Sequence, residues 1–172
     1  LLVDVAERMK NRPELRFVLI GDGADREKLE EDIARRGLNN IVMLGLQPRE
    51  AMPRWIASID VLLVMLRDLP VFETVIPSKI FEFLAQERPV VLAAKGEIRR
   101  MMEEANGALV IDPEVEDQMV SALETIISDP ESAKLRAESG RNWVDDGFIR
   151  DDLARRMAVF LEKVLEEAGA KH

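Results

Sequence analysis

Short apolar runs alternate with longer amphipathic segments along this chain, and that alternation limits its fold more than any other feature. The apolar runs are predicted strands at residues 16–20, 40–44, 60–66, 90–94 and 108–111. The amphipathic segments are predicted helices at residues 1–10, 24–36, 49–58, 78–86, 97–105, 114–128, 131–144 and 149–168. Strands that alternate with helices form right-handed βαβ crossovers, so we expect an α/β fold with a Rossmann-like, doubly wound parallel sheet.

The chain begins with a helix, which is unusual for this architecture. In doubly wound folds the first strand normally lies in the middle of the sheet. We therefore hypothesise that residues 1–172 are a single domain, and a fragment whose preceding residues supply the first, central strand. Two strand edges would then face each other unpaired. A continuous sheet built only from strands of this chain would contradict the hypothesis.

Composition narrows the class of protein. The chain has 172 residues, 47% of them apolar and 33% charged, as expected for one globular domain. A net charge of −9 argues against nucleic acid as a partner. There is no cysteine, and no apolar run approaches the ~20 residues that a membrane span needs. We expect a cytoplasmic protein without disulfides or thiolate chemistry.

Metal-dependent and histidine-dependent chemistry are not expected. The only histidine is the last residue, His172, where a tag remnant or a frayed end is the simpler interpretation. The pairs Asp145–Asp146 and Asp151–Asp152 are typical of solvated helix faces. No Asp-x-Asp sequence and no cluster with metal-ligand spacing is present, so we predict neither a metal nor a cofactor.

A glycine turn, Gly21-Asp22-Gly23, follows the first predicted strand and opens a helix. The third glycine of a dinucleotide fingerprint would stand at Arg26, and no acidic residue lies about 20 positions further on. Binding of NAD, FAD or ATP by such motifs is therefore disfavoured. Two interpretations stay open, a phosphate-binding turn and a tight turn that needs positive φ.

The segment from residue 67 to residue 86 carries most of the functional information. About ten residues separate the strand at 60–66 from the next helix, whereas 2–6 are usual, and the loop follows the carboxyl end of a strand. Pro77 and Ser78 precede the helix, where Ser78 can act as its cap. The free N–H groups of the first turn and the positive end of the helix dipole suit a phosphate.

Lys79 is informative because a cation in the first turn opposes the helix dipole, at a cost of ~0.3–1 kcal/mol. A bound anion would remove the conflict. Lys79, Glu82 and Gln86 form one polar stripe of the helix. The alternative is a surface pair between Lys79 and Glu82, worth ~0.3 kcal/mol, with Ser78 as a plain cap. The position beside the ligand edge of the sheet favours a functional role.

Several motifs together resemble a known family. They are GDG after a strand, NIVMLGLQP, MPRWIASIDVLLVML, TVIPSKIFEFLAQERPVVLA, NGALVIDPEVEDQMVSALETII and WVDDGF…LARRM. The combination resembles the C-terminal, donor-binding half of GT-B glycosyltransferases, in the large retaining group (glycosyl transferases group 1) that uses nucleotide-diphosphate sugars. The PSK..E variant is similar to bacterial transferases of N-acetylated amino sugars, such as fucosamine, in polysaccharide assembly.

The resemblance implies roles at matching positions. Glu82 matches the glutamate that holds the ribose hydroxyls of the nucleotide. Ser78 and Lys79 match positions whose backbone N–H groups contact the diphosphate. Gly45 and its two neighbours match the backbone that lines the base pocket, and Gly21 lets the chain pass close to the ligand. A UDP-sugar is the expected donor, and no catalytic residue is assigned.

Two departures from the family pattern stand out. The family's first glutamate, which touches the donor sugar, lies eight residues before Glu82, and Thr74 occupies that position here. Glu73 is one residue out of register, so we assign it no role. The basic pair that neutralises the diphosphate would lie ahead of Leu1, as would the acceptor domain.

We therefore expect the donor-binding domain of a retaining, metal-independent glycosyltransferase of bacterial cell-surface polysaccharide synthesis, inactive on its own. Its acceptor would be bound by the N-terminal domain outside the chain. That domain would also make any peripheral contact with the inner face of the membrane. Two alternatives stay open, a fragment of a sugar-nucleotide epimerase with the same fold and a non-catalytic Rossmann-like module.

Overall fold

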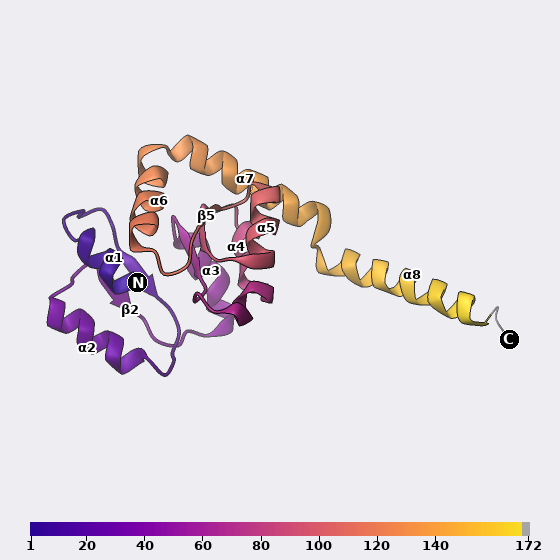
Figure 1. Cartoon of the computed structure of the whole chain (residues 1–172), viewed down its shortest axis with the longest axis horizontal. Helices are drawn as coiled ribbons and strands as arrows, with labels where there is room; N and C mark the ends of the chain where they lie inside the picture. The colour runs from indigo at the N-terminus through magenta and orange to yellow at the C-terminus, as the bar shows by residue number, and fades with distance from the viewer. Residues whose placement is uncertain (170–172) are drawn as a thin grey trace.

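The computed structural model describes residues 1–169, so His172 lies outside the described residues. The strands are β1 (Phe17–Leu19), β2 (Ile41–Met43), β3 (Leu62–Met65), β4 (Val90–Ala93) and β5 (Leu109–Ile111). The helices are α1 (Leu2–Arg8), α2 (Arg26–Arg36), α3 (Met52–Ser58), α4 (Lys79–Ala85), α5 (Gly96–Ala105), α6 (Glu116–Ser128), α7 (Pro130–Gly147) and α8 (Arg150–Gly169) (Figure 1). Two 3₁₀ turns complete the order, η1 (Arg49–Ala51) and η2 (Pro70–Thr74). All predicted strands and helices are present, whereas η2 was not predicted.

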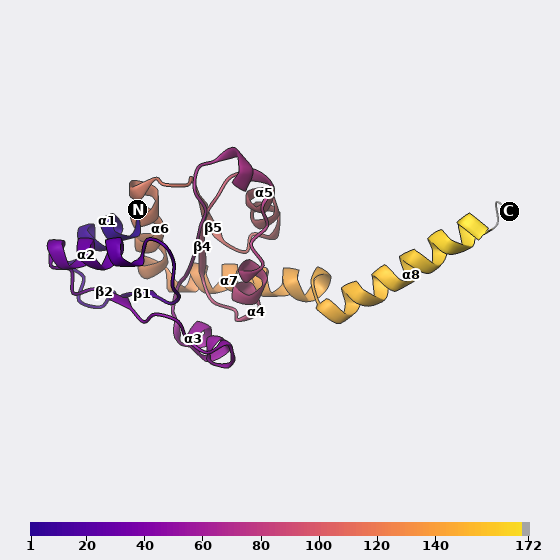
Figure 2. The same cartoon turned by 90° about the horizontal axis from the view of Figure 1, so that it is seen from below.

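The strands are parallel but form two separate sheets. One sheet pairs β1 with β2, with Phe17 opposite Ile41, and the other has the order β3–β4–β5. In the larger sheet Leu62 lies opposite Val90. Figure 2 shows β1 and β2 lying apart from the larger sheet. The α/β fold is confirmed, and among the described residues no strand occupies the centre, as the helix-first order predicted.

A cavity of about 790 Å³ lies between β1 and β3, and we call it the central groove. Residues of both strands line it, as do apolar side chains of the helices. Leu2, Leu123 and Ile127 come from α1 and α6, and Ile56 and Phe83 come from α3 and α4. The groove is therefore bounded by two strand edges and by helices.

Two hydrophobic clusters pack against opposite faces of the strands. The first joins α1, α2 and α6 to β1 and β2, and the second joins α3, α4, α5 and α7. β4 contributes Val91 and Ala93 to the first cluster and Val90 and Leu92 to the second, and all four are buried. Since both faces of β4 are covered, its sequence is uniformly apolar, as expected for a central parallel strand.

α7 packs against α4 and holds it in place. Ile80 and Leu84 of α4 are fully buried, and Arg141 of α7 donates a 2.6 Å hydrogen bond to the Ala85 carbonyl oxygen. At Gly140 the backbone of α7 comes so close that an added Cβ would lie 2.6 Å from Leu84 Cδ2. The first turn of α4, at the opposite end from Ala85, is thereby held in one orientation.

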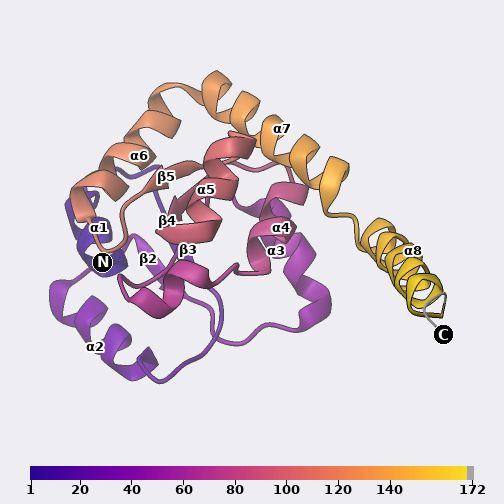
Figure 3. The same ribbon diagram turned by 45° about the vertical axis from the view of Figure 1, so that its right-hand side comes forward.

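α8 extends away from the rest of the chain, as Figures 1 and 3 show. It confirms the helix predicted at 149–168. Its apolar side chains, which include Leu153, Met157, Phe160 and Leu165, are exposed. No helix within residues 1–169 is long and apolar enough to cross a membrane.

Candidate functional site

The predicted site residues lie in the segments that follow β1, β2 and β3. Gly21 follows β1, Gly45 follows β2, and the segment from Ser78 to Glu82 ends the long connection after β3. Because the strands within each sheet are parallel, these segments leave from carboxyl ends, where open α/β sheets bind their ligands.

The structure brings Gly21 and Gly45 together. The Gly21 N–H donates a 2.9 Å hydrogen bond to the Gly45 carbonyl oxygen. Both residues have positive φ, 134° and 65°, which glycine adopts with little strain. A Cβ on Gly45 would lie 2.9 Å from Arg26 Nη1, so the guanidinium of Arg26 covers this turn.

Arg26 stands where a dinucleotide fingerprint would have its third glycine, and the sequence pattern alone gives it no role. In the structure Arg26 opens α2 with its guanidinium beside Gly45, and its Nε donates to Glu30 at 2.9 Å. A cation in the first turn of a helix, directly after a glycine turn, was the signal available in the sequence. It is the same signal that singled out Lys79.

The predicted side-chain cap at Ser78 is wrong, because its hydroxyl makes no cap hydrogen bond. Ser78 already has helical dihedral angles, φ −57° and ψ −30°, whereas a capping serine needs an extended backbone. The carbonyl oxygens of Pro77 and Ser78 accept from Ile80 and Phe81 instead. In the described part of the chain, the N–H groups of Ser78 and Lys79 have no acceptor, so two donors remain available to a ligand.

Lys79 lies exposed on the wall of the central groove with no carboxylate partner among residues 1–169. The alternative surface pair with Glu82 is not formed. Desolvation by the surrounding protein atoms lowers the pKa of Lys79 below its ordinary value. A bound anion would both neutralise this ammonium group and relieve its conflict with the helix dipole.

Glu82 lines the same groove one turn further along α4. Its side chain is exposed, and within the described residues its carboxylate accepts no hydrogen bond and joins no ion pair. Both carboxylate oxygens are therefore free to accept hydrogen bonds from a ligand. The structure thus places a free carboxylate, a free ammonium group and two free amides on one helix turn and its entry.

The connection after β3 is fastened to the start of α5. Lys95 Nζ donates to both carboxylate oxygens of Asp68, at 2.9 and 2.8 Å. Gly96 has a φ of 73°, and a Cβ there would lie 2.6 Å from the Glu73 Cα and closer still to the Glu73 carbonyl oxygen. The Thr74 hydroxyl donates to the Val71 carbonyl oxygen at 3.3 Å. Neither Glu73 nor Thr74 lines the central groove, and contact of either with a donor sugar stays a prediction.

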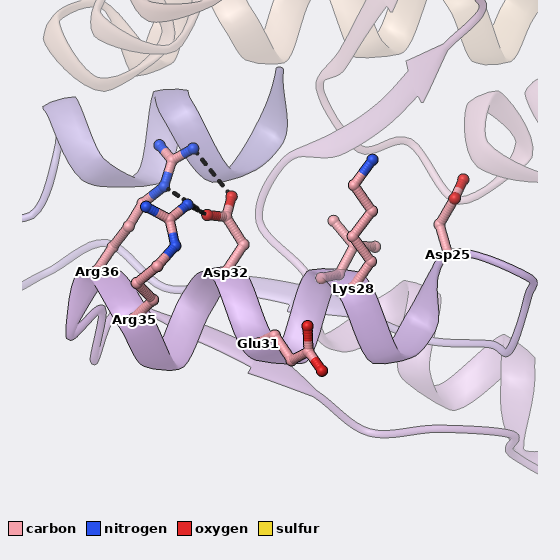
Figure 4. A pocket seen from close by; sticks show the side chains of 7 residues that line it. Asp25, Lys28, Glu31, Asp32, Arg35 and Arg36 are labelled. Carbon is pink, nitrogen blue, oxygen red and sulfur yellow. Dashed lines mark hydrogen bonds and ion pairs between the residues drawn. The ribbon is translucent and has the colours of Figure 1, made fainter.

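A second pocket, of about 520 Å³, lies along α2 and holds none of the predicted site residues (Figure 4). Three of its charged side chains, Asp32, Arg35 and Arg36, already form ion pairs. Arg36 contacts Asp32, Asp4 and Glu7, and Arg35 also pairs with Asp32. Among the described residues, no three His, Cys, Asp or Glu side chains gather as metal ligands would.

Residues 1–129 match the protein family described as Glycosyl transferases group 1. The chain is similar to an alpha-D-kanosaminyltransferase of Streptomyces kanamyceticus, with 29% identity over 135 residues, 78% of this chain and 34% of that protein. It is also similar to the putative colanic acid biosynthesis glycosyl transferase WcaI of Escherichia coli K12. That match has 26% identity over 147 residues, 84% of this chain and 36% of the relative. The chain thus spans little more than a third of these relatives.

Solved structures share the fold. The HepE protein of Anabaena, in complex with UDP-glucose, superposes with a TM-score of 0.80 at 21% identity, over 94% of this chain and 44% of that one. The C-terminal domain of the group 1 protein LpcC from Francisella tularensis superposes with a TM-score of 0.71 at 19% identity, over 87% of this chain and 78% of that domain.

Proposed function

Because this chain belongs to the glycosyl transferases group 1 family, we propose that it is the nucleotide-sugar-binding domain of a larger glycosyltransferase. One observation carries the proposal. The Lys79 ammonium group has a desolvation-lowered pKa and no carboxylate partner within the described residues, and it lies beside two unpaired backbone amides. Such a set of donors fits an anion of two or more charges, and a diphosphate has that charge.

Each predicted residue has one role in the proposal. The amides of Ser78 and Lys79, with the Lys79 ammonium group, hold the diphosphate. Glu82 accepts hydrogen bonds from the ribose hydroxyls, because its carboxylate has no protein partner among the described residues and lines the same groove. The backbone at Gly45 lines the base pocket, and Gly21 allows close approach. UDP is the proposed nucleotide, supported by the UDP-glucose held by HepE.

The proposed reaction breaks the bond between the anomeric carbon of the sugar and the diphosphate. It forms a bond from that carbon to an acceptor hydroxyl oxygen, whose proton leaves with the diphosphate. Negative charge develops on the leaving diphosphate. Fixed N–H groups and an ammonium group stabilise that charge most where water is excluded. The proposal includes retention of configuration, independence of metal ions and an acceptor held by residues outside this chain.

The biological setting is part of the same proposal. We infer a role in bacterial cell-surface polysaccharide synthesis, supported by the name of the colanic acid relative from Escherichia coli. The protein would work in the cytoplasm, and any contact with the inner face of the membrane would come from the part outside this chain.

Calorimetric titration of the chain with UDP, GDP, ADP and NAD tests the proposal. UDP should bind most tightly, and Glu82→Gln and Lys79→Met should each weaken it about 10- to 100-fold, the effect of ~1.5–3 kcal/mol for a charged hydrogen bond. UDP binding should also raise the pKa of Lys79, so protons should be taken up at alkaline pH. Titrations in two buffers of different ionisation enthalpy measure that uptake.

Two matched variants control the charge changes. Glu104→Gln alters an exposed carboxylate of α5, and Lys134→Met alters an exposed ammonium group of α7. Both should bind UDP as the unmodified chain does. Lys79→Met should keep or raise the melting temperature, because it removes a desolvated charge. UDP binding that is indifferent to Glu82 and Lys79, or no nucleotide binding, would favour the non-catalytic module.

A further inference from the structure

We propose that Arg26 recognises the base of the nucleotide, because its guanidinium group can donate hydrogen bonds to a carbonyl oxygen of uracil and so favour UDP over CDP. This inference rests on the proposed function, in which the backbone at Gly45 lines the base pocket. It adds a side chain that selects the base. Arg26 belongs to α2, whereas the proposed diphosphate donors belong to the start of α4, so the two contacts are separate.

The guanidinium group of Arg26 is held at one nitrogen and free at the other two. Its Nε donates to Glu30 at 2.9 Å. A Cβ on Gly45 would lie 2.9 Å from Nη1 and 3.6 Å from Nη2, so both of these atoms lie against the turn. Neither donates a hydrogen bond within residues 1–169, and Nη1 only approaches Asp22 at 4.0 Å. The N–H groups on Nη1 and Nη2 therefore remain for a ligand, in fixed and planar directions.

The turn at Gly45 also offers donors rather than acceptors. The carbonyl oxygen of Leu44 accepts from Gln47 Nε2 at 2.9 Å. The carbonyl oxygen of Gly45 accepts from the Gly21 N–H at 2.9 Å. In contrast, the N–H groups of Gly45, Leu46 and Gln47 have no acceptor in the described part of the chain. Gly45 is buried, and buried backbone donors are almost always paired in native structures, so a ligand edge that carries acceptors would fit here.

The local charge favours a neutral acceptor over a phosphate. The Arg26 cation lies beside two carboxylates, those of Glu30 and Asp22, so negative charge is in excess around it. A phosphate placed here would meet that excess at short range, where like charges repel. A carbonyl oxygen of a base accepts hydrogen bonds from the same guanidinium group without adding a charge.

A site with this excess of donors distinguishes uracil from cytosine. The two rings are similar in size, but cytosine carries an amino group, which donates, where uracil carries a carbonyl oxygen, which accepts. The amino group would face other donors and leave them unpaired, and a site built around a hydrogen bond rejects the analogue that cannot make it. The Arg26 side chain is 34% exposed, so water competes for it. We therefore expect UDP to bind at least about tenfold more tightly than CDP.

Calorimetric titration of the chain with UDP, CDP and ribose 5-diphosphate, which has no base, tests the inference. Arg26→Met should weaken UDP about tenfold and the other two ligands less than about twofold, so the preference for UDP over CDP should disappear. Arg26→Lys keeps the charge without the planar fork, so it should restore only part of that preference. Lys28→Met alters an exposed cation of the same helix and should leave all three affinities unchanged.

The three ligands separate recognition of the base from other roles of Arg26. Support of the fold alone would weaken all three ligands equally, and a phosphate contact would weaken ribose 5-diphosphate as much as UDP. Either result would overturn the inference, as would equal binding of UDP and CDP by the unmodified chain. If Arg26→Met does not fold, as judged by circular dichroism, the UDP preference of Arg26→Lys decides, and an unchanged preference refutes the inference.

Failure of the inference can be distinguished from failure of the proposed function. UDP binding that depends on Lys79 and Glu82 but not on Arg26 would leave the proposed function standing and refute the role of Arg26. If none of the three ligands binds, both are refuted.

Discussion

Replacing Gly96 with alanine should break the contact between η2 and the start of α5. The added Cβ would lie 2.6 Å from both the Cα and the carbonyl carbon of Glu73. Carbon atoms in contact normally lie ~3.5–4.0 Å apart, so the two backbones must separate by about 1 Å. Neither is the flexible end of a side chain, so a rotamer change cannot relieve the contact.

Two costs add in this variant. At a φ of 73°, alanine at position 96 is strained by ~1–2 kcal/mol, as in a left-handed helical conformation. Forcing packed elements apart adds ~1–3 kcal/mol. Gly37→Ala is a matched control, because Gly37 has a φ of 62° but no atom within 4 Å of its would-be Cβ. Only the first cost applies there, so Gly96→Ala should destabilise the chain by ~1–3 kcal/mol more than Gly37→Ala.

Urea unfolding followed by circular dichroism gives both free energies of unfolding, and equal m-values would confirm that the same surface is exposed on unfolding. Gly96→Ala should also weaken UDP binding, because η2 belongs to the connection that leads to Ser78, whereas Gly37→Ala should not. Equal destabilisation by the two alanines would show that the close approach of α5 to η2 carries no strain, and would refute the reasoning.

Three further predictions concern stability. Glu87→Gly should raise the free energy of unfolding by ~1 kcal/mol in urea titration, because Glu87 has a φ of 54°. Leu84→Ala should lower it by ~2–5 kcal/mol and lower the melting temperature, because Leu84 is fully buried. Hydrogen bonds from Gln118 and then Arg99 lower the pKa of Asp112, so its stabilisation is complete above the ordinary carboxyl pKa and is lost as pH falls through the folded-state pKa. Asp112→Asn should therefore flatten the loss of stability below about pH 4, measured by unfolding at pH 2–7.

The fold could be predicted from the sequence because its strongest signals are local. Five apolar runs separated by amphipathic segments fixed the order of strands and helices, and the uniformly apolar run at 90–94 became the fully buried strand β4. The helix-first order predicted two strand edges without a partner, because the first strand is normally central in such folds. In the structure, β1 and β3 belong to separate sheets and do not pair with each other.

Contacts between residues far apart in the sequence could not be predicted. Asp68 and Lys95 are 27 positions apart, and the packing of Gly96 on Glu73 depends on the path of η2. The prediction of a side-chain cap at Ser78 was wrong for a local reason. Serine is a preferred capping residue, but the backbone angles decide whether its hydroxyl can reach an amide, and the residue type does not reveal those angles. Lys79 and Glu82 could be singled out as site candidates because charge placement on a helix is visible in the sequence, and their contact with a nucleotide stays a prediction.

The two sheets have a consequence for any ligand that reaches both. Gly21 and Gly45 belong to the side of β1 and β2, whereas Lys79 and Glu82 belong to α4, on the side of the larger sheet. A nucleotide that contacts both groups of residues would span the central groove, and its length would set the distance between the two sheets. Ligand that binds only the folded state adds RT ln(1 + [L]/Kd) to stability. The first hydrophobic cluster already joins β1 and β2 to β4 of the larger sheet, so this energy should stabilise both sheets together and raise the melting temperature of the whole chain.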